Sequence, residues 1–92
     1  MHTVNVGQKV TVDQAATVLR AAGYAVTTGK SGEDLVVKKG AMKTSKVAVI
    51  PDGGSTEFQV RGAGWLISLR MMNERGIAKD VADLLENAAF SQ

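Results

Sequence analysis

The chain has 92 residues, of which 45% are hydrophobic and 22% are charged. These values are typical of one globular domain and exclude a chain that is disordered throughout. The absence of cysteine excludes disulfides, a thiolate nucleophile and a Cys-ligated zinc site. The net charge of +2 is too small to indicate a nucleic-acid partner by itself.

The N-terminal sequence lacks the basic start and the apolar core of a signal peptide. No run approaches the ~18 apolar residues that a membrane-spanning helix needs. We therefore expect a cytoplasmic protein without a membrane partner. A short protein of this composition is typical of accessory proteins of bacteria or phages, which act by binding other molecules.

Residues 11–23 predict a helix whose two ends are both marked. Thr11 is followed three residues later by Gln14, which is the pattern of a capping box. At the other end, Gly23 is the expected left-handed residue, and the next residue, Tyr24, would fold back onto Leu19 as in a Schellman motif.

Four strands are expected next, over residues 24–28, 34–39, 45–50 and 57–61. These segments are rich in β-branched residues and are separated by short loops. The sequence PDGG at residues 51–54 is typical of a turn, because proline fixes φ and glycine accepts positive φ.

Residues 61–76, RGAGWLISLRMMNERG, contain the only tryptophan of the protein and two of its four methionines. As a helix, this segment would place its apolar side chains all around the axis. As a strand over 65–72, it places four of them on one face: Trp65, Ile67, Leu69 and Met71. The pattern therefore favours a strand, preceded by a hairpin turn at the Gly-Ala-Gly of residues 62–64. A fully buried helix is the alternative.

A second amphipathic helix is predicted over residues 77–90. Its apolar stripe comprises Ile77, Val81, Leu84, Leu85 and Ala88. The order of elements is then helix, strands, helix. This order predicts a single α+β domain over residues 1–92, a two-layer sandwich. Its sheet is an antiparallel meander of four or five strands, flanked in sequence by an N-terminal and a C-terminal helix.

No segment carries a convincing catalytic or cofactor-binding motif. Residues 29–31, Gly-Lys-Ser, resemble the end of a phosphate-binding loop, but the preceding glycine is one residue too distant and a strand follows. Residues 62–64 lack the third glycine of a dinucleotide site. The single histidine, His2, is expected on a frayed terminus without a second histidine to form a metal site or a triad.

Three carboxylates share the polar face of the second predicted helix: Asp80, Asp83 and Glu86. They would suit a hard cation, but no Asp/Asn-rich calcium loop accompanies them, so a solvated helix face is the favoured interpretation. We therefore expect a protein that is not an enzyme and needs no metal or cofactor.

A basic hairpin is the first candidate surface. It comprises Lys38, Lys39, Met42, Lys43 and Lys46, with Lys30 nearby. Its lysines would contact phosphates in a nucleic-acid-binding regulatory module. The favoured alternative is that lysine on an edge strand prevents sheet-to-sheet aggregation. No aromatic residue interleaves these lysines as a stacking platform would require.

The sheet face that two helices leave uncovered is the second candidate surface. Its apolar residues would be Val36, Ile50, Leu66 and Met72. Because tryptophan and arginine are enriched at the centres of protein interfaces, the predicted interface comprises Arg61, Trp65, Leu66, Arg70, Met72 and Arg75. Packing under loops or in a homodimer is the alternative for these residues.

The sequence therefore predicts a small, non-enzymatic protein–protein interaction module that binds and modulates another protein. A nucleic-acid-binding module that uses the lysine hairpin is the alternative.

Overall fold

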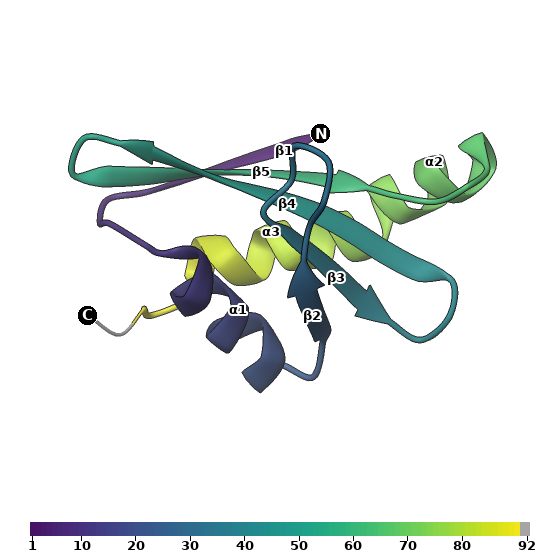
Figure 1. Cartoon of the computed structure of the whole chain (residues 1–92), viewed down its shortest axis with the longest axis horizontal. Helices are drawn as coiled ribbons and strands as arrows, with labels where there is room; N and C mark the ends of the chain where they lie inside the picture. Colours follow the sequence, from purple (N-terminus) through teal and green to yellow (C-terminus); the bar gives the residue numbers. More distant parts are fainter. Residues whose placement is uncertain (91–92) are drawn as a thin grey trace.

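The computed structural model describes residues 1–90, which contain one five-stranded sheet. The strands are β1 (His2–Val6), β2 (Ala25–Thr28), β3 (Leu35–Lys39), β4 (Lys43–Asp52) and β5 (Ser55–Gly62). All neighbouring strands are antiparallel, in the order β1-β5-β4-β3-β2. The helices of this part of the protein are α1 (Val12–Ala21), α2 (Ile67–Arg75) and α3 (Ile77–Asn87) (Figure 1).

The predicted α+β fold with an open antiparallel sheet is confirmed. Strands β2, β3, β4 and β5 lie where the sequence placed them, and the PDGG segment forms the tight β4–β5 hairpin. Gly53 at its tip has φ +61°, a left-handed conformation that glycine adopts without a steric penalty. Strand β4 is longer than predicted, because it pairs with β3 along its first half and with β5 along nearly its whole length.

The core lies between one face of the sheet and the helices α1 and α3. Alternate residues of the central strands, such as Val37, Val47 and Phe58, are fully buried on this face. They share a single cluster with Leu19 of α1 and with the stripe of α3 that includes Leu85. Residues of opposite parity form the other face of the sheet, which neither helix covers.

Both predicted ends of the first helix are confirmed. The Thr11 hydroxyl accepts from the Gln14 N–H at 3.1 Å, while the Gln14 side chain accepts from the Thr11 N–H at 2.8 Å. At the other end, the Gly23 N–H donates to the Arg20 carbonyl and the Tyr24 N–H donates to the Leu19 carbonyl, which completes the Schellman motif.

The fifth strand is β1, not residues 65–72 as predicted. Residues 2–6 pair along β5, with Val4 opposite Phe58 and Thr3 opposite Gln59. Val4 is buried whereas its neighbours Thr3 and Asn5 are exposed, so β1 has the alternation of a strand with one face in the core. The backbone then passes from β1 to α1 through residues 7–11.

A buried hydroxyl fixes this connection to the sheet. The Thr56 hydroxyl in β5 accepts from the Val10 N–H at 2.8 Å and donates to the Gln8 carbonyl at 3.0 Å. Thr56 is 2% exposed, so water cannot replace these bonds without opening the structure.

We predict that Thr56→Val lowers the free energy of unfolding by roughly 1–3 kcal/mol, because it leaves the buried Val10 N–H without a partner. Thr27→Val, at an exposed position of β2, is the matched control and should change stability little. Urea unfolding of both variants measures the difference. Equal stability of the two variants would show that the Thr56 bonds contribute nothing.

Candidate protein-interaction surface

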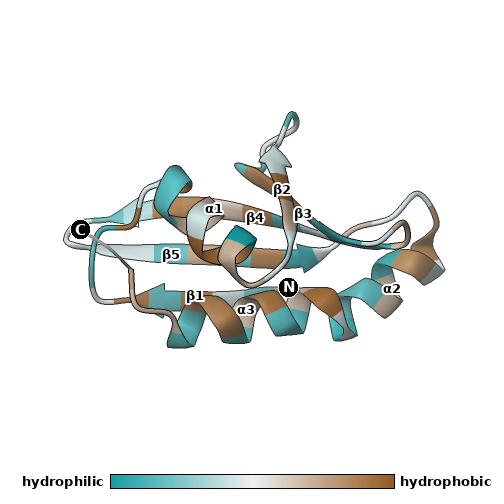
Figure 2. Ribbon diagram, turned by 90° about the horizontal axis from the view of Figure 1, so that it is seen from below, coloured by the Kyte–Doolittle hydropathy of each residue, from teal (hydrophilic) through white to brown (hydrophobic). Residues whose placement is uncertain are grey.

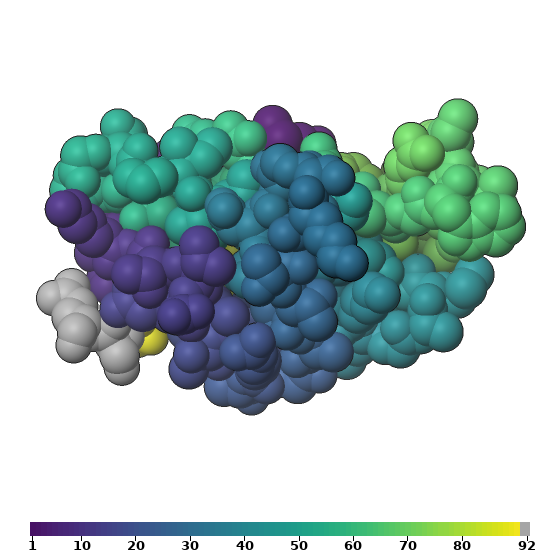
Figure 3. All heavy atoms as spheres, in the orientation of Figure 1, coloured from purple at the N-terminus to yellow at the C-terminus, as the bar shows by residue number. Residues whose placement is uncertain are grey.

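The prediction of a strand over residues 65–72 is wrong, because residues 67–75 form the helix α2. This helix lies at one end of the molecule, beside the tip of the β3–β4 hairpin, and projects from the rest of the structure (Figures 1 and 3). The strand prediction assumed that apolar side chains point into the core. In α2 they do not, and the contacts below give the reason.

A buried asparagine attaches α2 to the sheet. Asn73 is 2% exposed, and its side-chain amide donates to the Ala63 carbonyl at 2.6 Å and to the Met42 carbonyl at 3.1 Å. These two carbonyls belong to the segment after β5 and to the β3–β4 hairpin tip. One polar side chain therefore bonds α2 to two separate segments of the protein.

Glu74, the residue after Asn73 in α2, attaches the helix to the end of β5 and to the N-terminal residues 1 and 2. Glu74 accepts from the Gly62 N–H at 2.8 Å, and its other oxygen lies 2.7 Å from the Met1 ammonium nitrogen. His2 is not on a frayed terminus as predicted: its Nε2 lies 2.8 Å from the Glu74 carbonyl oxygen and 3.3 Å from the Glu74 carboxylate. Pairing of β1 with β5 holds His2 in this place.

The same contacts set the ionisation of Glu74. Its partial burial would raise its pKa by desolvation. Hydrogen bonds from the Met1 ammonium and the Gly62 N–H, together with the nearby positive charge, outweigh this effect, so the pKa of Glu74 is lowered. The carboxylate is therefore the form that holds α2 at neutral pH.

Two glycines let α2 approach the end of β5 closely. A β-carbon at Gly62 would meet main-chain atoms of α2, including the Arg70 carbonyl oxygen at 2.6 Å, and one at Gly64 would meet the Leu69 side chain at 2.7 Å. The Gly-Ala-Gly sequence is therefore neither the predicted hairpin turn nor a nucleotide motif. It is glycine because the backbones of β5 and α2 come too close for a larger residue.

Because polar residues face inward, α2 and the residues before it expose apolar ones. Five large apolar side chains, which we call the α2 patch, are 44–78% exposed: Trp65, Leu66, Ile67, Met71 and Met72. The start of α2 accordingly has a hydrophobic colour in Figure 2, at the extremity of the molecule. The exposed Met1 shares a shallow hollow with Ile67 and Met71.

Several predicted interface residues are thus brought together, although not on a sheet face. Trp65, Leu66, Met72 and Arg75 are exposed on α2 or just before it. Sequence reasoning missed Ile67 and Met71, because a period of two assigned them to the core. The sequence feature that could have identified Ile67 and Met71 as neighbours is their i, i+4 spacing, which places both side chains on one face of a helix.

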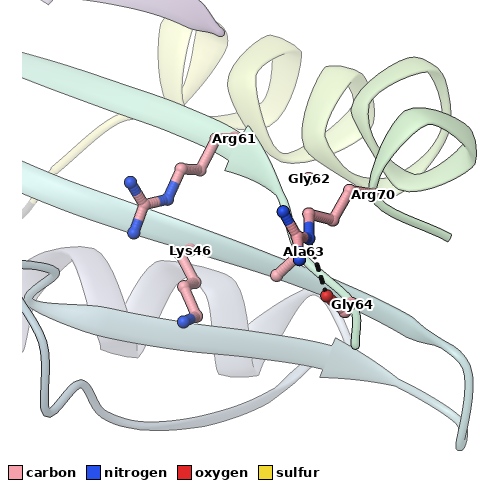
Figure 4. A pocket seen from close by; sticks show the side chains of 6 residues that line it. All are labelled: Lys46, Arg61, Gly62, Ala63, Gly64 and Arg70. Atoms are coloured by element: carbon pink, nitrogen blue, oxygen red, sulfur yellow. Dashed lines mark hydrogen bonds between the residues drawn. The ribbon is translucent and has the colours of Figure 1, made fainter. Parts of the chain in front are cut away.

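The two remaining arginines of the predicted interface lie beside the α2 patch, in a hollow of about 450 Å³ (Figure 4). Arg61 is on the uncovered face of β5, directly across from Lys46 of β4. Arg70 projects from α2, and its Nε donates to the Gly64 carbonyl at 2.9 Å. We call this feature the basic hollow; its lining comprises Lys46, Arg61, Gly62, Ala63, Gly64 and Arg70.

A carboxylate from the β2–β3 connection pairs with two of the cations of the basic hollow. Glu33, in the β2–β3 connection, has a side chain only 5% exposed, with Lys46 Nζ at 3.6 Å and Arg61 Nη2 at 3.8 Å. Desolvation would raise the pKa of Glu33, but hydrogen bonds from the main chain at 30, 31 and 33, then the charge of Lys46, outweigh it and lower the pKa. Within residues 1–90, its Oε2 has no hydrogen-bond partner.

The residues of the predicted lysine hairpin do not form one surface. Lys38 and Lys46 lie on the uncovered face of the sheet, whereas Lys39 and Lys43 pair with each other on the opposite face. The Lys39 ammonium lies 5.2 Å from the Tyr24 ring centre. Lys30 lies in the loop that holds Glu33, and Met42 is exposed at the hairpin tip.

The edge-strand interpretation of these lysines is also wrong. Strands β3 and β4 are internal, and the edges of the sheet are β1 and β2. Of the apolar residues expected on the uncovered face, Val36 is half-buried and Ile50 is 37% exposed, at a distance from α2 along the strands. The uncovered sheet face therefore has no apolar patch comparable with that of α2.

No helix within residues 1–90 has the length and apolarity needed to cross a membrane. Comparison of the sequence and structure with protein-family models, with curated proteins and with solved structures gave no match. The geometry of α2 and its surroundings is therefore the basis for the function proposed below.

We predict that Gly62→Ala loosens α2, because the added carbon collides with its backbone. The expected cost is about 1–3 kcal/mol, the usual range for overpacking, and faster amide hydrogen exchange in residues 67–75 should accompany it. Gly54→Ala is the control, since open space surrounds that position. If amide hydrogen exchange in α2 is unchanged in Gly62→Ala, the close approach of the two backbones does not explain the glycine at this position.

The lowered pKa of Glu74 predicts a pH-dependent contribution to stability. A carboxyl whose pKa is lower in the folded state stabilises above its unfolded value, near 4.5, and this contribution disappears as pH falls through the folded value. Wild type should therefore exceed Glu74→Gln in unfolding free energy at pH 7 and lose this advantage progressively as the pH falls below 4.5. A difference that is independent of pH would contradict the charge-based attachment.

Proposed function

We propose that the protein is a non-enzymatic interaction module that binds another protein through the α2 patch. The observation that carries the proposal is the inverted arrangement of α2, in which Asn73 is buried while Trp65 and Ile67 are 78% and 69% exposed. Several large apolar side chains exposed within one short segment are a common mark of a protein-binding site.

The residue types of the α2 patch favour a protein as the ligand. Tryptophan, methionine and arginine are enriched at protein interfaces, and all three are present on or beside α2. Ile67 and Met71, at i and i+4, would enter an apolar groove as anchors, in the manner of helix-in-groove recognition. Trp65, directly before the helix, would extend the contact.

The charges beside the patch favour a different protein over a second copy of this one. Arg70 and Arg75 are both exposed on α2. A two-fold symmetric pairing through α2 would bring the same surface, with its positive charges, against itself. A partner whose groove has an acidic rim would complement these arginines.

The arrangement of the lysines does not favour nucleic acid. A backbone-tracking site requires a continuous basic groove, with aromatic side chains on which bases stack. Here the hairpin lysines are divided between the two faces of the sheet, and Trp65 precedes α2 and is not part of this hairpin.

We predict that the double variant Trp65→Ser/Met71→Ser loses partner binding. Truncation of an aromatic anchor typically costs about 2 kcal/mol or more, roughly thirtyfold in affinity, while loss of exposed side chains should leave stability within about 0.5 kcal/mol. The measurement is capture by the tagged protein from a nuclease-treated lysate of the cells that produce it, read by mass spectrometry.

Ile50→Ser, which removes an exposed apolar side chain from the sheet, is the matched control. A protein retained by wild type and by Ile50→Ser but lost by the double variant supports the proposal. Retention by the double variant contradicts it. If a protein is captured only when nuclease is omitted, binding is to nucleic acid, and the lysine residues become the candidate site. If the protein sediments as a dimer, the occupant of the α2 patch is a second copy of the same chain.

A further inference from the structure

The basic hollow carries more positive charge than its surroundings neutralise. It has three cationic side chains, Lys46, Arg61 and Arg70. Two carboxylates touch its lining: Glu33 pairs with Lys46 and Arg61, whereas Glu74 accepts from the Gly62 N–H and pairs with the Met1 ammonium. Glu33 also accepts hydrogen bonds from its own loop. The ion pairs of Glu33 are both longer than 3.5 Å, and they are made with Lys46 and Arg61, not with Arg70.

Arg70 is held in an orientation that suits a planar anion. Its Nε donates to the Gly64 carbonyl, which fixes the plane of the guanidinium. The described residues provide no hydrogen bond or ion pair to its two terminal nitrogens. The edge formed by two such nitrogens matches the two oxygens of a carboxylate, and this pairing is stronger than a neutral hydrogen bond.

The other two cations lie on the same surface as Arg70. Figure 4 shows the Arg61, Lys46 and Arg70 side chains extending over adjoining segments of β4, β5 and α2. The side chain of Arg61 is 52% exposed and that of Lys46 is 33% exposed. An anion that enters the hollow therefore replaces water around these groups without displacing a buried contact.

We infer that the basic hollow binds a carboxylate of the protein partner that covers the α2 patch. The inference rests on the proposed function, since the hollow and the patch share the segment of residues 62–70. A carboxylate is favoured over a nucleic-acid phosphate, because the adjoining surface is apolar and offers no continuous basic track for a phosphate backbone. The side chain of an aspartate or glutamate and the carboxyl terminus of a polypeptide would both supply this carboxylate.

The test uses the 92-residue protein and needs no identified partner. Three probes are titrated into ¹⁵N-labelled protein and followed by NMR: the peptide acetyl-Leu-Glu-Leu-amide, whose only carboxylate is on its glutamate; acetyl-Leu-Leu-Leu with a free carboxyl terminus; and inorganic phosphate. We expect at least one peptide to shift the Gly64 amide and the Arg70 Nε–H signals saturably. The peptide that does so identifies the source of the carboxylate.

Arg70→Gln should weaken this binding roughly tenfold, as expected for loss of a charged hydrogen-bonding group, and Arg61→Gln should weaken it as well. Lys9→Gln, which removes one charge at an exposed residue of the β1–α1 connection, is the control and should bind like wild type. An equal loss in Lys9→Gln would indicate only long-range attraction and overturn the site. Unchanged affinity in Arg70→Gln and Arg61→Gln would also overturn it.

Absence of shifts with both peptides at millimolar concentration overturns the inference. Saturable shifts with phosphate alone overturn the carboxylate assignment. Failure here remains distinguishable from failure of the proposed function, because Trp65→Ser/Met71→Ser should retain carboxylate binding while losing the captured protein.

Discussion

The attachment of α2 to the end of β5 determines which side chains this end of the protein exposes. Two backbones meet where Gly62 leaves no room for a side chain, and Asn73 and Glu74 make the bonds that hold them. The bonds link α2 to three segments: β1, the tip of the β3–β4 hairpin and the end of β5. A helix attached in this way does not need an apolar face against the sheet.

The polar attachment and the exposed apolar surface are two consequences of one arrangement. When the inward positions of a short helix hold an asparagine and a glutamate, its apolar residues can only face outward. The same close approach brings Arg70 beside Arg61 and Lys46, which lie on strands. An apolar surface and a cationic one therefore adjoin at one end of the molecule, although each draws residues from different elements.

Most of the fold is predictable because its signals are local. The capping box at Thr11, the alternation in β2–β5 and the stripe of α3 each report their own surroundings. Residues 65–72 were mispredicted because both periodicities presuppose that apolar side chains are buried, and in α2 the buried residue is Asn73. Strand β1 was missed because a short segment at a terminus gives little pattern until its partner, β5, is known. Leu66 and Met72 were predicted to be exposed from their parity on a strand, and they are exposed at the start of α2 and on it instead. The joining of Arg61 with Arg70 depends on tertiary contacts.

The apolar residues of α2 have no role that the fold itself requires. Asn73, Glu74 and the two glycines account for the attachment of the helix, and Leu69 is the half-buried apolar residue beside Gly64. Lysine or glutamate at positions 67, 71 and 72 would suit these solvent-facing sites and reduce the tendency to aggregate. Large apolar side chains in their place are a cost to the isolated protein, and burial against a partner is the physical circumstance in which they become favourable.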